Sequence, residues 1–101
     1  ILSPTSIGYT YLNNKKSFLQ NEKKMWKTVI QANSLMNNIP IVVINRIGVE
    51  KDSTRKIHFW GNSFITNADG YIVKEAKGSS EVLRHTFDII DRQKSIKKWN
   101  F

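Results

Sequence analysis

The sequence contains no cysteine among its 101 residues. These residues therefore hold no disulfide, no thiolate metal site and no cysteine nucleophile. No apolar run approaches the roughly 20 residues that a membrane-spanning helix needs. The first residues lack the basic start and the long apolar stretch of a signal peptide, so we expect none. The absence of cysteine fits a reducing compartment, and we expect a cytoplasmic protein.

Acidic residues are also scarce, with 8 Asp and Glu against 16 Lys and Arg, which gives a net charge of +8. Such a charge can indicate a nucleic-acid partner. It can equally reflect a lysine-rich organism, or a longer protein whose acidic residues lie elsewhere. No aromatic platform is interleaved with a basic stripe. We therefore do not expect a nucleic-acid partner.

Apolar residues make up 40% of the sequence and aromatic residues 11%. This composition predicts an ordered chain with a modest core. The sequence opens within an apolar run, and we expect residues 1–101 to form a single partial domain.

The strongest helix signal covers Glu22–Asn38. Apolar residues recur there with helical spacing, and others widen the stripe into a face that we expect to be buried. The first set is Met25, Val29, Ala32 and Met36, and the second is Trp26, Ile30 and Leu35. Asn21 is the expected amino-terminal cap, and Asn37, Asn38 and Pro40 the expected stop.

Strand signals occupy most of the remaining sequence. The continuous β-branched run Ile41–Ile44 predicts a strand covered on both faces. Alternating segments on either side of a turn predict a hairpin, followed by an imperfect strand and a helix capped by Asp88. These segments are Gly61–Thr66, the turn Asn67–Gly70, Tyr71–Glu75, Glu81–Phe87 and Ile89–Trp99. We expect Ile1–Leu2 to end a strand, and residues 9–21 and 49–56 to be loops. The order predicts an α/β layered fold, a mixed sheet covered by two helices.

Several short motifs follow one another in a fixed order. They are SPTSIG, Trp26-x-x-Val29, Asn37-x-Ile39-Pro40, NRIG-x-E, FWGNSFI and G-x-I-V-x-E-A. Together they resemble the C-terminal part of a nitrilase-superfamily carbon–nitrogen hydrolase. Within that superfamily the resemblance is to the N-carbamoylputrescine amidohydrolase (β-alanine synthase-like) branch.

The resemblance implies the C-terminal half of an α-β-β-α sandwich. It also implies a Glu-Lys-Cys thiol mechanism acting on a small linear amide or on an N-carbamoyl amine such as N-carbamoylputrescine, without cofactor or metal. All three triad residues lie N-terminal to the matched region, so no residue of this chain is assigned a catalytic role. We expect a homo-oligomer, or a partner chain that supplies the missing half. The alternative is a truncated, inactive remnant that acts only by association.

The resemblance and the strand ends together select candidate substrate-pocket residues. They are Thr5, Ser6, Asn45, Arg46, Phe59, Trp60, Gly61 and Ser63. Each has a structural alternative. The hydroxyl groups of Thr5 and Ser6 could satisfy loop backbone, Arg46 could pair with a carboxylate, and the two aromatic residues could pack in the core.

Overall fold

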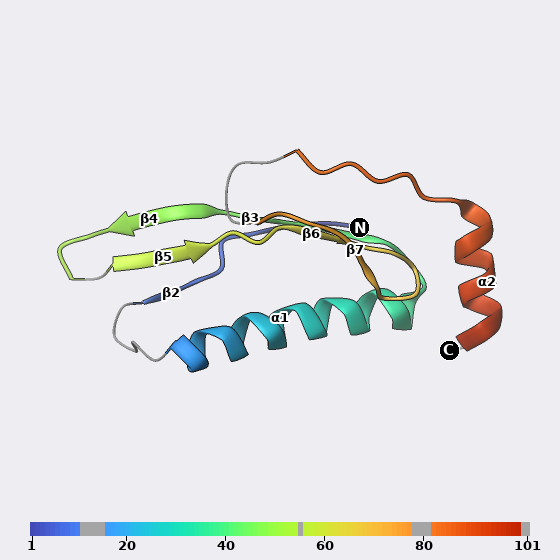
Figure 1. Cartoon of the computed structure of the whole chain (residues 1–101), viewed down its shortest axis with the longest axis horizontal. Helices are drawn as coiled ribbons and strands as arrows, with labels where there is room; N and C mark the ends of the chain where they lie inside the picture. Colours follow the sequence, from blue (N-terminus) through green and yellow to red (C-terminus); the bar gives the residue numbers. More distant parts are fainter. Residues whose placement is uncertain (11–15, 55, 78–81, 100–101) are drawn as a thin grey trace.

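The computed structural model describes residues 1–10, 16–54, 56–77 and 82–99 (Figure 1). Two strands precede the first helix in this part of the chain, and five strands separate it from the second helix. In order they are β1 (Leu2–Thr5), β2 (Gly8–Thr10), α1 (Lys16–Asn37), β3 (Ile41–Asn45), β4 (Ile47–Lys51), β5 (Lys56–Trp60), β6 (Phe64–Thr66), β7 (Ile72–Glu75) and α2 (Ile89–Trp99).

The strands form two sheets. The first has the order β1-β3-β6-β7, in which β1 runs parallel to β3 and the other pairs are antiparallel. The second has the order β2-β5-β4 and is antiparallel throughout. The first sheet is therefore mixed, and the predicted α/β class is confirmed.

Helix α1 covers one face of the first sheet (Figure 1). The core on this side consists of Ile41, Val43 and Phe64, against which Trp26 and Ile30 of the helix pack. The ring of Trp26 meets that of Phe64 edge-on, with centroids 5.2 Å apart. Edge-to-face packing of this kind adds to the stabilisation that comes from burial alone.

The predicted buried face of α1 was wrong in part. Met25, Val29 and Met36 are 60%, 58% and 61% exposed, whereas Trp26 and Ser34 face the sheet. A helix turns by about 100° per residue, so neighbouring positions define two different stripes. The sheet receives the stripe whose indole reaches Phe64 and whose serine hydroxyl can bond to buried polar atoms. The Met and Val stripe points away.

The two ends of α1 differ in how well the sequence predicted them. The helix begins at Lys16 rather than at Glu22, so Asn21 lies inside it and is not its cap. Its end was predicted correctly: Asn38 has a φ of 51°, Asn38 N–H donates to Leu35 O, and Ile39 N–H donates to Ser34 O. This pair of bonds is a Schellman motif. In the described residues neither helix has the length and apolar character needed to cross a membrane.

Several strand predictions also need correction. The expected loop 49–56 is largely a hairpin. In it β4 and β5 pair antiparallel, with Ile47 opposite Trp60 at one end and Lys51 opposite Lys56 at the other. Residues 50–56 of the sequence are rich in charged side chains, so the alternation typical of strands is not visible there. Residues 9 and 10, expected to be loop, belong to β2. The first strand, expected to end at Leu2, continues through Pro4 to Thr5, which an edge strand tolerates. Residues 82–87 are not a strand, and Glu81 lies outside the described residues.

The second face of the first sheet is open where β1 and β3 run. Leu2 and Ile44 are 73% and 52% exposed, so Ile41–Ile44 is covered on one face and not on both as predicted. The accessible surface is 7335 Å², against about 5,900 Å² for a compact protein of this mass. The described fold therefore leaves apolar side chains of this sheet face exposed.

Candidate functional site

The candidate pocket residues lie where the chain passes from one sheet to the other. Three segments cross there, from β1 to β2, from β3 to β4 and from β5 to β6. In the first sheet β3 is the neighbour of β1, but in the second sheet β5 is the neighbour of β2. The β3–β4 and β5–β6 segments thus exchange places. We call this region the sheet junction.

Asn45 connects all three segments of the sheet junction. Its side-chain Nδ2 donates to Ile7 O at 3.0 Å and to Gly61 O at 2.8 Å. Its Oδ1 accepts from Ile7 N–H at 2.8 Å and from the hydroxyl of Thr5 at 3.1 Å. Both donors and both acceptor positions of the amide are therefore used within the protein. Asn45 is buried, and its part in this geometry is to hold the junction together.

Thr5 at the end of β1 and Ser63 just before β6 complete this network from the two sides of β3. Ser63 Oγ accepts from Asn45 N–H at 2.8 Å and donates to Asn45 O at 3.3 Å. The Thr5 hydroxyl lies 3.1 Å from both Ile44 O and Asn45 Oδ1. Sequence reasoning placed these residues in one site, and the structure brings them together. Their hydroxyl groups are engaged with backbone and amide atoms, which is the structural alternative for Thr5.

The β5–β6 segment turns through two consecutive left-handed residues, Gly61 with a φ of 61° and Asn62 with a φ of 60°. Gly61 is buried, and its N–H donates to Arg46 O at 3.0 Å. Glycine suits such a conformation, and asparagine tolerates it better than most other residues do. This turn explains why a glycine interrupts the aromatic and apolar run of FWGNSFI.

The outer part of the junction carries charge and an aromatic ring. The guanidinium carbon of Arg46 lies 4.4 Å from the ring centroid of Phe59. Nη1 of Arg46 forms an ion pair with Oε2 of Glu50 at 2.9 Å. Arg46 is exposed and Phe59 is buried. Ser6 is exposed as well. These are the candidate residues best placed to meet a ligand approaching the junction.

Trp60 lies on the helix side of the sheet. Its ring centroid is 5.9 Å from that of Trp26, and the side chain is buried. Its neighbour in sequence, Phe59, contacts Arg46 instead, because successive side chains of a strand point to opposite faces. The two predicted aromatic residues therefore do not line one pocket, and Trp60 has the contacts of a packing residue.

A polar cluster that the sequence did not predict lies beside the junction. Glu75 at the end of β7 forms an ion pair with Lys27 and accepts from Asn62 Nδ2 at 2.6 Å. Burial alone would raise the pKa of Glu75. The hydrogen bonds from Lys27 and Asn62 and the charges of Lys27 and Lys23 outweigh burial, so this pKa lies below its ordinary value. The residues are far apart in sequence, and no periodic pattern connects them.

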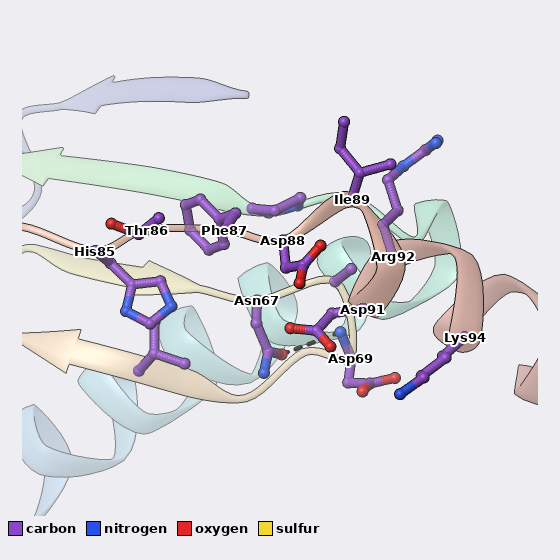
Figure 2. A pocket seen from close by; sticks show the side chains of 13 residues that line it. Asn67, Asp69, His85, Thr86, Phe87, Asp88, Ile89, Asp91, Arg92 and Lys94 are labelled. Carbon is purple, nitrogen blue, oxygen red and sulfur yellow. Dashed lines mark hydrogen bonds between the residues drawn. The ribbon is translucent and has the colours of Figure 1, made fainter.

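A hollow of about 470 Å³ lies at the end of the first sheet that is opposite to the sheet junction. It is bounded by the β6–β7 turn with Asn67 and Asp69 and by the start of α2 with Asp88 and Asp91 (Figure 2). Asp88 accepts from Ile90 N–H at 2.9 Å and so caps α2, as predicted. This hollow is distant from the sheet junction and contains none of the sequence-predicted pocket residues.

Most polar side chains of the junction are already engaged within the protein. The chain has no cysteine, and among the described residues no group of three His, Asp or Glu side chains is placed to hold a metal. Asn45, Thr5 and Ser63 are occupied by one another and by backbone atoms. What remains is a rigid edge from which Ser6 and Arg46 are presented.

Comparison with known proteins places this geometry in a family. The sequence profile of the carbon–nitrogen hydrolases matches residues 10–96. The chain is 36% identical over 101 residues to N-carbamoylputrescine amidase of Oryza sativa subsp. japonica, covering 95% of this chain and 32% of that protein. It is 30% identical over 101 residues to citrullinase of Francisella tularensis subsp. tularensis (strain SCHU S4 / Schu 4), covering 98% of this chain and 34% of that protein. The chain thus spans about a third of the length of these curated relatives.

A solved structure agrees with the sequence relatives. The carbon–nitrogen hydrolase from Helicobacter pylori G27 superimposes with a TM-score of 0.91 and 25% sequence identity, covering 99% of this chain and 35% of that one. The two sheets and both helices of this chain therefore follow an arrangement already found within a larger hydrolase. On the profile match, the sequence relatives and the shared fold, the chain belongs to the carbon–nitrogen hydrolase family.

Proposed function

We propose that this chain is part of a hydrolase that cleaves a small linear amide or an N-carbamoyl amine, with N-carbamoylputrescine as the representative substrate. The proposal draws on two relatives named for related substrates, N-carbamoylputrescine amidase and citrullinase. N-carbamoylputrescine and citrulline both end in a ureido group, whose carbon is bonded to nitrogen on both sides. Hydrolysis of such a group releases an amine, ammonia and carbon dioxide.

The proposed mechanism is the Glu-Lys-Cys thiol mechanism. A thiolate attacks the carbonyl carbon, a glutamate acts as general base, and a lysine stabilises the oxyanion. The chain has no cysteine, so the nucleophile must come from residues outside these 101. The part of the chain described here would contribute a wall of the substrate pocket.

The observation that carries this role is the Asn45 network at the sheet junction. Ligands of α/β proteins gather at the carboxyl ends of parallel strands, and β1 and β3 end here side by side. The buried side-chain amide of Asn45 donates two hydrogen bonds and accepts two, and these four bonds fix the loops that follow these strands. Such a rigid edge is what a substrate pocket requires of its supporting elements.

The experiment compares the 101-residue chain alone with the same chain supplied with the remaining part of a carbon–nitrogen hydrolase that carries the triad. Ammonia release from N-carbamoylputrescine and from citrulline is the readout. We expect none from the chain alone and turnover from the complemented protein. Ammonia release by the chain alone would contradict the proposal. A folded complemented protein without activity would favour the alternative of an inactive remnant.

We further propose that the exposed stripe of α1 is covered by a second copy of the chain. Met25, Val29 and Met36 lie along one side of this helix and are all more than half exposed. Large contiguous apolar patches on a soluble protein mark interaction sites. The open sheet face at Leu2 and Ile44 would instead be covered by the rest of the same hydrolase domain.

A charge placed in the α1 stripe tests the homo-oligomer. Val29→Glu should shift the complete protein toward monomers in light scattering at low micromolar concentration. Thr28→Glu is the matched control, because Thr28 is exposed on the same helix and lies outside the stripe. Unchanged mass for Val29→Glu, or an equal shift for Thr28→Glu, would remove the stripe as the contact surface.

A further inference from the structure

A second hollow, of about 310 Å³, lies between the first half of α1 and the end of β7. Trp60 and Ala76, both buried, provide an apolar part of its wall. Polar and charged side chains complete the lining, and they come from three separate parts of the chain. They are Lys23, Asn62, Glu75 and Lys77.

Positive charge predominates around this hollow. Lys23 and Lys77 line it together with Glu75, and Lys27 is bonded to Glu75 beside it. Lysine therefore outnumbers glutamate in the lining of the hollow. The hollow therefore attracts anions, and its own carboxylate is already engaged by a cation and by an amide.

The pKa of Lys23 is consistent with an anion site in this hollow. Burial lowers the pKa of Lys23, and the nearby charge of Lys27 lowers it further, while Glu75 acts in the opposite direction. The ammonium group is thus held in a place where its charge is under-compensated. A bound anion would supply the missing negative charge.

Asn62 fixes the shape of the lining on the β5–β6 side. It adopts a left-handed conformation, and its Nδ2 donates to Ala76 O at 3.0 Å as well as to Glu75. These bonds tie the turn to the end of β7. The wall between the two lysines is therefore braced by hydrogen bonds.

We infer that this hollow binds a small anion that carries a phosphate group. Lysine is a common phosphate ligand and acts as a point charge. The volume of the hollow is at the small end of the range for ligand sites. The indole of Trp60 and the methyl group of Ala76 offer apolar surface to an organic substituent. The inference does not depend on the proposed hydrolase reaction.

The test is calorimetric titration of the complete protein at constant ionic strength, first with inorganic phosphate and then with phenyl phosphate. We expect saturable binding with one site per chain. Tighter binding of phenyl phosphate would identify a phosphate ester as the ligand, and equal binding would identify free phosphate. Either result supports the inference.

Variants locate the site. Lys23→Met and Lys77→Met should each weaken binding about tenfold, the expected effect of losing one charged hydrogen bond. Glu75→Gln should strengthen binding, because it removes a negative charge and releases Lys27. Lys24→Met is the matched control, since Lys24 is exposed on α1 and does not line the hollow. Absence of saturable binding, or an equal loss in Lys24→Met and Lys23→Met, would overturn the inference.

Discussion

The side chain of Asn45 donates a 2.8 Å hydrogen bond to the carbonyl oxygen of Gly61, 16 residues further along the chain. This bond joins the segment that leaves β3 to the segment that enters β6. The two segments exchange places between the sheets, so neither can be held by the regular ladder of a single sheet at this point. A side-chain amide supplies the bonds that the ladder cannot.

Replacing Asn45 should therefore destabilise the protein strongly. Asn45→Ala leaves Ile7 N–H and Gly61 O without their side-chain partner and removes one of the two donors to Ile7 O, which keeps Trp60 N–H. We expect a loss of about 3 kcal/mol in the free energy of unfolding. Urea denaturation measures it. Asn37→Ala is the control, because the side chain of the exposed Asn37 donates to Asn33 O within α1. Similar losses for the two variants would contradict the role assigned to Asn45.

The buried hydroxyl groups of Ser34 and Thr66 should be energetically coupled. Thr66 Oγ1 lies 2.9 Å from Ser34 Oγ, and both residues are 0% exposed. Ser34→Ala should cost about 1–3 kcal/mol, because its hydroxyl lies 2.6 Å from both Ile39 O and Asn67 O. In a double-mutant cycle with Thr66→Val we expect a coupling of about 1 kcal/mol. Strictly additive losses would contradict the coupling.

The Glu75 cluster predicts a pH-dependent contribution to stability. The pKa of Glu75 is lower in the folded protein than its ordinary value of 4.5, so its contribution is fully present above that value. The contribution is lost as the pH falls through the lowered pKa. Lys27→Met should cost less than about 1 kcal/mol at pH 7, since the pair is partly exposed, and less still at about pH 2.

Lys23→Met should have a different effect from Lys27→Met. Burial and the charge of Lys27 both disfavour the ammonium form of Lys23. Removing that charge should leave the free energy of unfolding unchanged, or raise it by up to about 0.5 kcal/mol at pH 7. Urea denaturation of the two variants side by side decides the matter. A loss for Lys23→Met equal to that for Lys27→Met would mean that the two ammonium groups are equivalent.

Arg46 offers a test of the proposed substrate wall that does not perturb the core. In the complemented hydrolase, Arg46→Gln should lower kcat/KM by about tenfold while thermal stability changes little, because Arg46 is exposed. Lys97→Gln on α2 removes the same charge far from the junction in sequence and should leave kcat/KM unchanged. Glu50→Gln removes the ion-pair partner of Arg46 and leaves Arg46 itself in place. This variant therefore distinguishes an effect of Arg46 on the substrate from an effect of the Arg46–Glu50 pair. Equal effects of Arg46→Gln and Lys97→Gln would remove Arg46 from the pocket.

Local signals in the sequence determined several elements of this fold. The end of α1 follows from Asn38, which can adopt the left-handed conformation of the cap, and the start of α2 follows from the capping side chain of Asp88. The β6–β7 turn follows from Asn67–Gly70, where the Asn67 side chain bonds to Asp69 N–H and Gly70 has a φ of 81°. These features depend on conformational preferences within a few residues. The sequence motifs also predicted the family correctly.

Only the tertiary structure decided which face of α1 is buried. Two apolar stripes compete on this helix, and the stripe with Trp26 and Ser34 wins because Phe64 and Thr66 lie opposite it. The same holds at the sheet junction. Sequence reasoning could select Thr5, Asn45 and Ser63 as strand-end residues, but not the saturation of Asn45 by Ile7 and Gly61. That saturation, like the meeting of Lys27 with Glu75, depends on contacts between distant segments, which no local preference encodes.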